Sequence, residues 1–424
     1  GLQVINDRII RVRATHEEAF PQKKPSLMIV PQQEKPDYTV SEESGKVRVI
    51  AKGVTAVVDK SNGRVEFYDA EGNALLKETT ENGKTFEPFY VPDNEIGVGT
   101  LTEEQRNGWT WHAQFDSPDD EAFYGLGQHQ SEEYNMKGKN EDLFQYNTKV
   151  SVPFVMSNKN YGLLWDSYSY CRWGNPNDYL QLHRAFTLYD KEGNPGHLTG
   201  TYTDAKGKTL VQAEDSLYYE HAFTVTNLPK GFNLDGAKVV YEGFLESPMT
   251  TTYHFILYYA GYTKVYIDNK EVVAERWRTA WNPNAWKFDC PLVQGERTPI
   301  RVEWVPDGGV SYCGLRAAAP QTEEEQGRLS VWSEMARDMD YYFIAGKNMD
   351  EVISGYRTLT GKAQVMPKWV MGFWQSRERY KTSAELEGTL ADFRNRHIPV
   401  DNIVQDLNYW KEDEWGSHEF ESSR

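Results

Sequence analysis

A carboxylate that follows an apolar run is the residue of this sequence best placed to do chemistry. Asp406 comes directly after residues 402–405, which read as a strand behind a helical pattern that begins at Thr382. In α/β barrels, the carboxyl ends of the strands carry the functional side chains. A carboxylate in an otherwise apolar setting is costly unless it has partners. We therefore interpret Asp406 as a ligand-binding residue, with an ion pair to a side chain such as Arg377 as the structural alternative.

A group of aromatic residues is the second candidate. Trp277, Trp281 and Trp286 lie close together in a polar, turn-rich stretch, and aromatic residues make up 13% of the chain. Flat ring faces pack well on other flat apolar faces, and the C–H faces of sugars are of this kind. The three tryptophans are a candidate platform for stacking a sugar chain, and packing in a core is the equally weighted alternative.

The overall composition limits the class of protein. The chain has 424 residues, of which 39% are hydrophobic and 26% charged, which is enough apolar material for the cores of two to four domains. A net charge of −17 without a basic tract argues against a nucleic-acid partner. No apolar run approaches the length of a membrane span. Residues 1–13 lack a signal-peptide pattern and read as a strand already begun, so we expect residues to precede Gly1.

The cysteines do not identify a metal site. Cys171, Cys290 and Cys313 form neither a C-x-x-C pair nor a metal-ligand spacing. A disulfide between Cys290 and Cys313 and buried free thiols are both open, and buried thiols are favoured.

The elements that must position these residues begin with a β-sandwich over residues 1–190. Apolar residues alternate in 47–51 and 54–58, and Asn62-Gly63 between alternating runs is a hairpin signal. Residues 321–347 contain a polar linker and then an apolar strand, so they are predicted to close this first sandwich. Between them, residues 196–320 again alternate, for example at 253–257 and 263–267, and are predicted to form an inserted second β-sandwich.

In residues 348–424 the spacing of apolar residues changes from strand-like alternation to a mixture of helical and strand patterns. Val352, Ile353, Tyr356 and Leu359 share one helical face that ends at Gly361. The apolar run 369–374 is typical of a buried parallel strand. Thr382 and Glu385 have capping-box spacing before a helix with its stripe at Leu386, Leu390 and Phe393, and the next strand follows. The fold class is thus mainly β with the start of an α/β barrel, of which one βαβ unit is present.

Motifs in two parts of the chain resemble glycoside hydrolase family 31. Phe123-Tyr124-Gly125-Leu126-Gly127-Gln128 resembles the N-terminal β-sandwich of the family. The ordered set 340–344, 354–361, 367–377 and 401–406 is similar to the family's passage from sandwich into barrel. Residues 377–382 resemble the xyloglucan-type α-xylosidase branch. The insert resembles the protective-antigen-type β-sandwich, but its stretch 258–261 lacks the adjacent aspartates of calcium-binding members, so no metal site is predicted.

The resemblance implies roles for several residues. The matching aspartate of the family accepts hydrogen bonds from hydroxyls of the sugar being cleaved, which assigns that role to Asp406. The further residues implied at the sugar pocket or its rim are Leu407, Trp410, Trp374, Arg377, Tyr380 and Asn147. For Trp374 a position in the core is favoured over one in the pocket, and for Trp410 the two positions are equally weighted. Lys149 follows the 146–148 loop where many α-glucosidases of the family have an acidic residue.

The resemblance also places the catalytic pair. The two catalytic aspartates of the family lie on later barrel strands than those present here. We therefore expect the nucleophile and the acid/base beyond Arg424, and no catalytic residue of either kind in this chain.

The resulting functional expectation is a retaining hydrolase that removes terminal α-xylosyl residues from xyloglucan oligosaccharides without a metal or cofactor. The alternatives are an α-glucosidase or transglucosylase of the same family and, for the chain alone, an inactive carbohydrate-binding fragment. The expected partners are the oligosaccharide substrate and the remaining catalytic barrel, as a continuation of the chain or as a second chain. A polymer-derived substrate and the insert favour an extracytoplasmic location, which means periplasmic, cell-surface or secreted.

Overall fold

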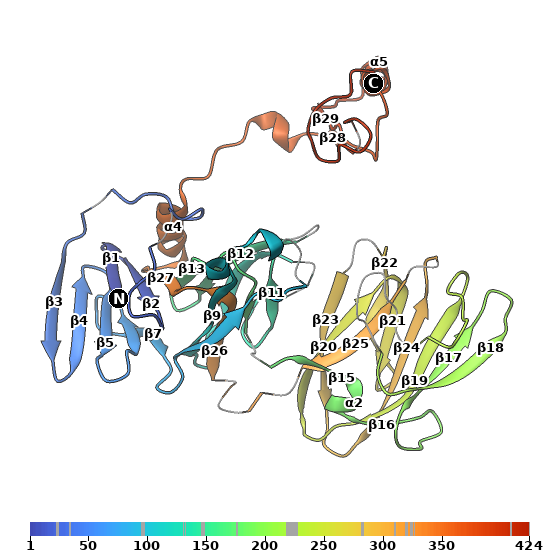
Figure 1. Cartoon of the computed structure of the whole chain (residues 1–424), viewed down its shortest axis with the longest axis horizontal. Helices are drawn as coiled ribbons and strands as arrows, with labels where there is room; N and C mark the ends of the chain where they lie inside the picture. Colours follow the sequence, from blue (N-terminus) through green and yellow to red (C-terminus); the bar gives the residue numbers. More distant parts are fainter. Residues whose placement is uncertain are drawn as a thin grey trace. The chain divides into compact units, whose positions relative to one another are not determined.

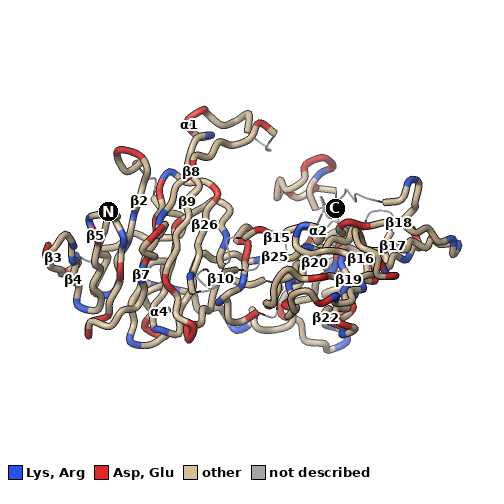
Figure 2. The backbone as a smooth tube through the Cα atoms, turned by 90° about the horizontal axis from the view of Figure 1, so that it is seen from below, with Lys and Arg blue, Asp and Glu red and all other residues tan. Residues whose placement is uncertain are grey.

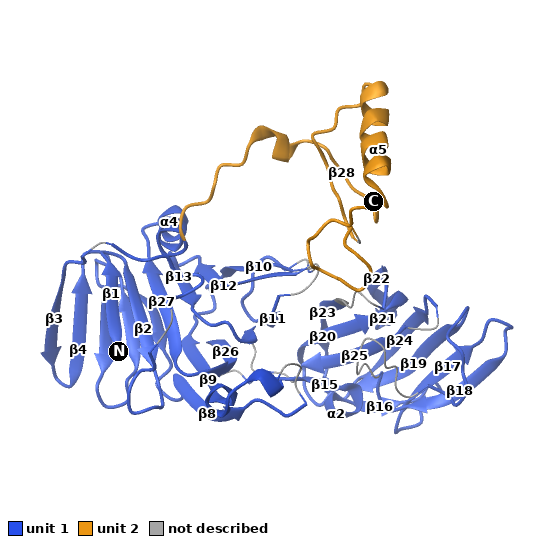
Figure 3. Cartoon of the chain, turned by 45° about the horizontal axis from the view of Figure 1, so that its top comes forward, with its two compact units in different colours: residues 1–360 blue, residues 361–424 orange. Residues whose placement is uncertain are grey.

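The computed structural model divides the chain into two compact units, residues 1–360 and 361–424 (Figure 3). It describes the chain except for residues 23–24, 34, 95–97, 130, 132, 146–148, 175–176, 218–227, 281–283, 309–310, 319–320, 323–324, 326, 408 and 424. Among the described residues, no helix combines the length and the apolar character needed to cross a membrane. Acidic and basic residues are interspersed along the strands of the first unit (Figure 2).

The first sandwich of unit 1 is built from two large antiparallel sheets (Figure 1). Within the described residues, the six-stranded sheet has the order β1 (Leu2–Asn6), β2 (Ile9–Ala14), β27 (Met339–Ala345), β13 (Tyr161–Trp165), β12 (Val150–Ser157) and β10 (Phe123–Gln128). The other sheet has the order β11 (Glu141–Leu143), β14 (Cys171–Trp173), β26 (Arg328–Ala336), β9 (Asn107–Asp116), β7 (Ala74–Glu78), β6 (Val65–Tyr68), β5 (Thr55–Asp59), β4 (Lys46–Ala51) and β3 (Tyr38–Glu43), with β8 (Lys84–Tyr90) on β9. The short helices η1 (Val98–Thr100) and α1 (Glu103–Arg106) lie between β8 and β9.

The core of this sandwich confirms the alternating pattern of the sequence. Val49 and Ala51 of β4 point into the core while their neighbours are exposed or half-buried. Phe67 stacks on Phe343 of the opposite sheet with ring centroids 4.0 Å apart. The fully buried carboxylate of Glu78 accepts hydrogen bonds from the Tyr341 hydroxyl at 2.7 Å and from the Val65 amide at 2.8 Å, and it also pairs with Lys84. A buried carboxylate requires such partners.

The second sandwich has a separate hydrophobic core. Its described four-stranded sheet has the order β15 (Tyr179–Gln181), β25 (Cys313–Ala318), β20 (Thr251–Tyr259) and β23 (Asn284–Leu292). The larger sheet has the order β18 (Thr209–Glu214), β17 (Leu198–Thr203), β19 (Lys238–Glu246), β24 (Arg297–Val305), β21 (Gly261–Ile267) and β22 (Lys270–Arg278), with β16 (Thr187–Tyr189) on β19 and the helix α2 (Leu182–Ala185) nearby. Because β15 and β16 pair with strands of this sandwich, it takes in residues that precede 196. Residues 223–225, an alternating Phe-Thr-Val run within the predicted second sandwich, lie outside the described residues.

A buried ion-pair network joins the two sandwiches. Lys287 of β23 lies 3.3 Å from Glu141 of β11, and it donates a hydrogen bond to the carbonyl of Asn140. Glu141 also pairs with Lys149 at 3.0 Å and lies 3.3 Å from His129. Burial alone would raise the pKa of Glu141, but the charges of Lys287 and Lys149 outweigh it and lower that pKa. The network therefore holds an ionised carboxylate between a host strand and an insert strand.

The chain returns to the first sandwich before it enters unit 2. Strand β26 pairs with β9 and β14, and β27 pairs with β2 and β13. The helix α4 (Met349–Thr360) then packs on β13 and β27 with Val352 and Leu359 buried. Ile353, predicted on the same face, is 41% exposed. Gly361, at φ +89°, ends the helix as predicted.

Unit 2 contains one parallel strand pair among its described residues. Its elements are the 3-10 helix η2 (Lys368–Met371), β28 (Trp374–Gln375), α5 (Ser383–Asn395) and β29 (Asn402–Ile403). The continuous strand predicted over 369–374 is wrong, because residues 368–371 form η2 and only Trp374 of that run is in a strand. A short apolar run does not distinguish a strand from a helical turn by its periodicity. The fold class is otherwise confirmed, with two β-sandwiches and the first βαβ unit of a barrel.

Candidate functional site

The parallel pair β28–β29 places the ends of two strands side by side. The Val404 amide donates to the Gln375 carbonyl at 2.9 Å, so the strands stay paired up to the predicted site. At their start, the Asp401 carboxylate accepts from the Phe373 amide at 2.9 Å. An added Cβ on Gly372 would lie 2.0 Å from Asp401 Oδ2, so only glycine allows this close approach. The carboxyl ends of the two strands, where Asp406 was predicted, consequently lie together.

Asp406 is exposed at the end of β29. Its Oδ1 accepts the Leu407 amide at 2.7 Å, which fixes the carboxylate relative to its own backbone. Arg377, considered above as its ion-pair partner, instead pairs with Glu385 Oε1 at 3.4 Å. An ionised carboxylate has about four lone-pair positions, so it can accept further hydrogen bonds from a ligand's hydroxyl groups. The geometry is compatible with the predicted role, which stays a prediction.

Tyr380 is anchored by two glutamines, Gln375 of β28 and Gln405, which follows β29. Its buried hydroxyl accepts from Gln375 Nε2 at 3.1 Å, and its carbonyl accepts from Gln405 Nε2 at 3.3 Å. The guanidinium carbon of Arg377 lies 5.4 Å from the Tyr380 ring centroid. The sequence interpretation assigned no role to either glutamine, although an amide at the end of each strand was a visible signal. These bonds hold the loop 376–381 against the ends of both strands.

The cap of α5 supports the same loop. Thr382 Oγ1 accepts the Glu385 amide at 3.1 Å, which is one of the two bonds of the predicted capping box. The Glu385 carboxylate accepts from the Lys381 amide at 2.8 Å and also pairs with Arg377. The half-buried stripe of α5 contacts the first strand, with Phe393 5.7 Å from Phe373 between ring centroids. The loop is thus fixed at both of its ends.

Apolar side chains at the start of unit 2 are open to solvent. Trp374, for which a core position was favoured, is 43% exposed and stacks on Trp369 with centroids 5.7 Å apart. Its indole N–H donates to the Val370 carbonyl at 3.1 Å. Trp410 is buried and contacts Tyr409 and Trp415, with ring centroids 5.0 and 5.4 Å away. Within unit 2, Trp374 therefore presents its ring outward and Trp410 helps to build the unit.

The remaining binding candidates lie in unit 1. Asn147 and Trp281 are outside the described residues. Trp277 is 45% exposed, and its indole N–H donates to Asp307 Oδ2 at 2.8 Å. Trp286 packs against the second core beneath the guanidinium of Arg276. The structure thus leaves Trp277 available for stacking and uses Trp286 as part of the sandwich.

The catalytic nucleophile and acid/base were expected beyond Arg424, on later strands of the barrel. Arg424 itself lies outside the described residues. The last described strand of unit 2 is β29. Asp406, the only carboxylate predicted in unit 2 as a site residue, was assigned to sugar binding. The position of the catalytic pair therefore stays a prediction.

The described residues contain no group of three or more His, Cys, Asp or Glu side chains arranged to hold a metal ion. The three cysteines are free and buried, which confirms the favoured alternative. Burial raises the pKa of the Cys171, Cys290 and Cys313 thiols, so each is protonated at neutral pH.

Two family models match the chain. Residues 1–173 match the glycosyl hydrolase 31 N-terminal galactose mutarotase-like domain, and residues 363–424 match the glycosyl hydrolases family 31 TIM-barrel domain. The second match begins just after the boundary between the two units.

Individual proteins agree with these matches. The crystal structure of an α-xylosidase from Xanthomonas citri is 39% identical and superposes with a TM-score of 0.87 over 100% of this chain and 45% of its own. An α-xylosidase of Saccharolobus solfataricus is 45% identical over 98 residues, which are 23% of this chain and 13% of that protein. Alpha-glucosidase 2 of Bacillus thermoamyloliquefaciens is 38% identical over 71 residues, 17% of this chain and 9% of that protein. The chain thus spans less than half of the length of these proteins.

Proposed function

Because the chain belongs to glycoside hydrolase family 31, we propose that it is part of a retaining α-xylosidase that removes terminal α-xylosyl residues from xyloglucan oligosaccharides. The observation that carries this proposal is the similarity to the Xanthomonas citri α-xylosidase, which extends over both sandwiches and the barrel segment. The α-xylosidase of Saccharolobus solfataricus supports it independently through sequence.

In the proposed reaction, this chain supplies sugar-binding residues and the rest of the barrel supplies the catalytic carboxyl groups. Retaining hydrolysis requires two carboxyl groups about 5–5.5 Å apart, one to attack the anomeric carbon and one to protonate the leaving oxygen. We assign this pair to later barrel strands. Asp406, at the end of β29, binds hydroxyls of the sugar ring and so fixes the anomeric carbon against the nucleophile. The loop held by Tyr380 forms part of the wall around that sugar.

The test of the reaction is a comparison of two aryl glycosides with the complete protein. We expect hydrolysis of p-nitrophenyl α-xyloside with a kcat/KM at least about tenfold above that for p-nitrophenyl α-glucoside. The two sugars differ only by a hydroxymethyl group, and exclusion of such a group discriminates by about 1–3 kcal/mol. A preference for the glucoside would assign the protein to the α-glucosidases, which the match to alpha-glucosidase 2 keeps as the second candidate.

We further propose that the second sandwich extends the substrate-binding surface through Trp277. Its indole ring is exposed, and its N–H is fixed by Asp307 at 2.8 Å. Trp277→Ala in the complete protein should raise KM for a xyloglucan oligosaccharide severalfold and leave KM for p-nitrophenyl α-xyloside unchanged. Equal changes for both substrates would mean that the sandwich is a structural brace.

The location that suits this function is extracytoplasmic, since oligosaccharides cut from a wall polymer are met outside the cytoplasm. Fractionation of the native host, followed by immunoblotting for residues 1–360, tests this part of the proposal. Detection only in the cytoplasmic fraction would exclude it.

A further inference from the structure

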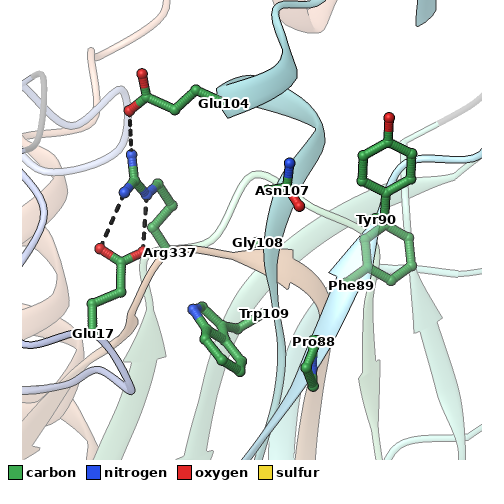
Figure 4. A pocket seen from close by; sticks show the side chains of 9 residues that line it. All are labelled: Glu17, Pro88, Phe89, Tyr90, Glu104, Asn107, Gly108, Trp109 and Arg337. Atoms are coloured by element: carbon green, nitrogen blue, oxygen red, sulfur yellow. Dashed lines mark hydrogen bonds and ion pairs between the residues drawn. The ribbon is translucent and has the colours of Figure 1, made fainter.

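A pocket of about 380 Å³ lies at one end of the large sheet of the first sandwich (Figure 4). Three segments that are distant in sequence form it: the loop after β2, the β8–β9 pair with α1, and the turn between β26 and β27. Figure 2 shows α1 projecting beyond the ends of β8 and β9. Its residue Glu104 lines the pocket. The volume is within the range of about 300–1,000 Å³ that is typical of small-molecule sites.

One side of the pocket is a guanidinium held between two carboxylates. Arg337 donates from Nε and Nη2 to the two oxygens of Glu17, both at 3.1 Å, and from Nη1 to Glu104 at 2.7 Å (Figure 4). These bonds engage three of the five N–H groups of a guanidinium. Each carboxylate also keeps lone pairs directed elsewhere. The group therefore offers hydrogen-bond donors and acceptors next to each other.

Three aromatic residues line the pocket together with Pro88, Asn107 and Gly108. Figure 4 places Trp109 below the guanidinium and the rings of Phe89 and Tyr90 across from it. The Trp109 ring lies 4.3 Å from the His16 ring at an angle of 32°. The guanidinium carbon of Arg106 lies 4.3 Å from the Tyr90 ring centroid. Because neighbours support both rings, a ligand does not have to order them, and this lowers the cost of binding.

The charges restrict the class of ligand. An anion that approached Arg337 would meet the carboxylates of Glu17 and Glu104, which already occupy the fork of the guanidinium. A wholly apolar ligand would remove these charged groups from water and leave the two remaining N–H groups of Arg337 and the remaining carboxylate lone pairs without partners, at a cost. A sugar hydroxyl both donates and accepts, so it can bond to the guanidinium and a carboxylate together. The C–H face of the same ring can pack on Trp109 or Tyr90.

We propose that this pocket is a binding site for a neutral oligosaccharide, with Trp109 and Tyr90 stacking on pyranose rings and Arg337, Glu17 and Glu104 bonding to hydroxyls. The identification of the natural ligand as the glucan backbone of xyloglucan rests on the proposed function; binding of a neutral sugar does not. Such a site would hold a polymer on the first sandwich independently of hydrolysis.

The test is isothermal titration of the 424-residue chain with cellotetraose, a β-linked glucan without xylosyl groups, and with trigalacturonate as an anionic probe. We expect cellotetraose to bind and trigalacturonate not to bind. Trp109→Ala should weaken cellotetraose binding about fivefold to tenfold, the effect of losing one ring contact. Tyr90→Ala, which removes a ring that is 45% exposed, should act in the same direction and serves if Trp109→Ala folds poorly. Tyr134→Ala is the matched control, because this tyrosine of the first sandwich is 85% exposed and does not line the pocket.

Three results would overturn the proposal. One is absence of cellotetraose binding by the wild-type chain at millimolar concentrations. Another is binding that both pocket variants retain and that Trp277→Ala removes, because this would place the sugar on the second sandwich. The third is tighter binding of trigalacturonate than of cellotetraose. Each readout is independent of α-xylosidase activity, so failure of this proposal and failure of the proposed function are distinguishable.

Discussion

Replacement of Lys287 by methionine should destabilise the contact between the two sandwiches. The Lys287 ammonium lies 3.3 Å from Glu141, and the side chains are only 12% and 5% exposed. Burial acts to lower the pKa of Lys287, but the Glu141 charge and other nearby acids outweigh it and raise that pKa. Methionine keeps most of the apolar length of the side chain and removes the charge, together with the hydrogen bond to the Asn140 carbonyl.

The size of the stability loss depends on the ion-pair partners that remain to Glu141. Removal of one partner from a buried ion pair costs about 3–5 kcal/mol, because the other charge stays buried without compensation. Glu141 retains Lys149 at 3.0 Å, so only part of this cost applies. We expect a loss of about 2 kcal/mol, which corresponds to a Tm lower by roughly 4–8 °C for a cooperative unit of 150–250 residues. Lys287→Met should cost less stability in a chain that already carries Glu141→Gln, because no buried carboxylate charge is then left uncompensated.

Differential scanning calorimetry of the 424-residue chain measures the effect, and Lys270→Met is the matched control. Lys270 pairs with Asp268 at 2.9 Å, but its side chain is 78% exposed, and solvent-exposed ion pairs contribute little to stability. We expect the Tm of this control to change much less than that of Lys287→Met. If Lys287→Met melts within about 1 °C of wild type, the ion pair does not hold the sandwiches together and the argument from burial is wrong.

Three further predictions concern the site and the buried groups. In the complete protein, Asp406→Ala should lower kcat/KM at least about tenfold with little change in Tm, because a charged hydrogen bond contributes about 1.5–3 kcal/mol. A lower Tm with unchanged kcat/KM would mean that Asp406 has a structural role. The 424-residue chain alone should not hydrolyse p-nitrophenyl α-xyloside, because its described residues form only one parallel strand pair of the barrel, and turnover above a heat-treated control would contradict this. Burial lowers the pKa of His112 from 6.5 to about 4. The unfolded ring therefore binds a proton first as pH falls, and roughly 2–3 kcal/mol of stability should be lost between about pH 6.5 and about pH 4. In urea titrations His112→Gln should remove this dependence, and equal pH slopes in both proteins would refute the assignment.

Alternation along strands predicted most of the β architecture, because each side of a sandwich strand has a different environment. β4 and β21 follow their patterns residue by residue, and the turn Asp268-Asn269 has the positive φ angles of a tight hairpin, 54° and 59°. The start of the second sandwich was harder to predict. β15 and β16 are only three residues each, too short to show a period, and only pairing with distant strands assigns them.

The sequence predicted where Asp406 lies relative to the strands, but not the hydrogen bonds that hold the neighbouring loop. Asp406 could be assigned because it follows the second strand, and barrel strands present their carboxyl ends to ligands. This assignment needs no tertiary information. The bond from Gln405 to Tyr380 joins residues 25 positions apart, and no local pattern encodes such a pairing. The pocket around Arg337 includes a bond between residues 320 positions apart and was missed for the same reason.

The exposed apolar residues of unit 2 connect stability with sugar recognition. A two-stranded sheet is at best marginally stable in water, and Met371 and Trp374 are 81% and 43% exposed beside it. In the proposed complete enzyme, further barrel strands and helices would cover side chains of this kind and exclude water from the strand ends. A hydrogen bond from a sugar hydroxyl to Asp406 would then form in a medium of lower dielectric constant, where it is stronger than in water. The burial that completes the barrel would therefore also give Asp406 its strength as a sugar ligand.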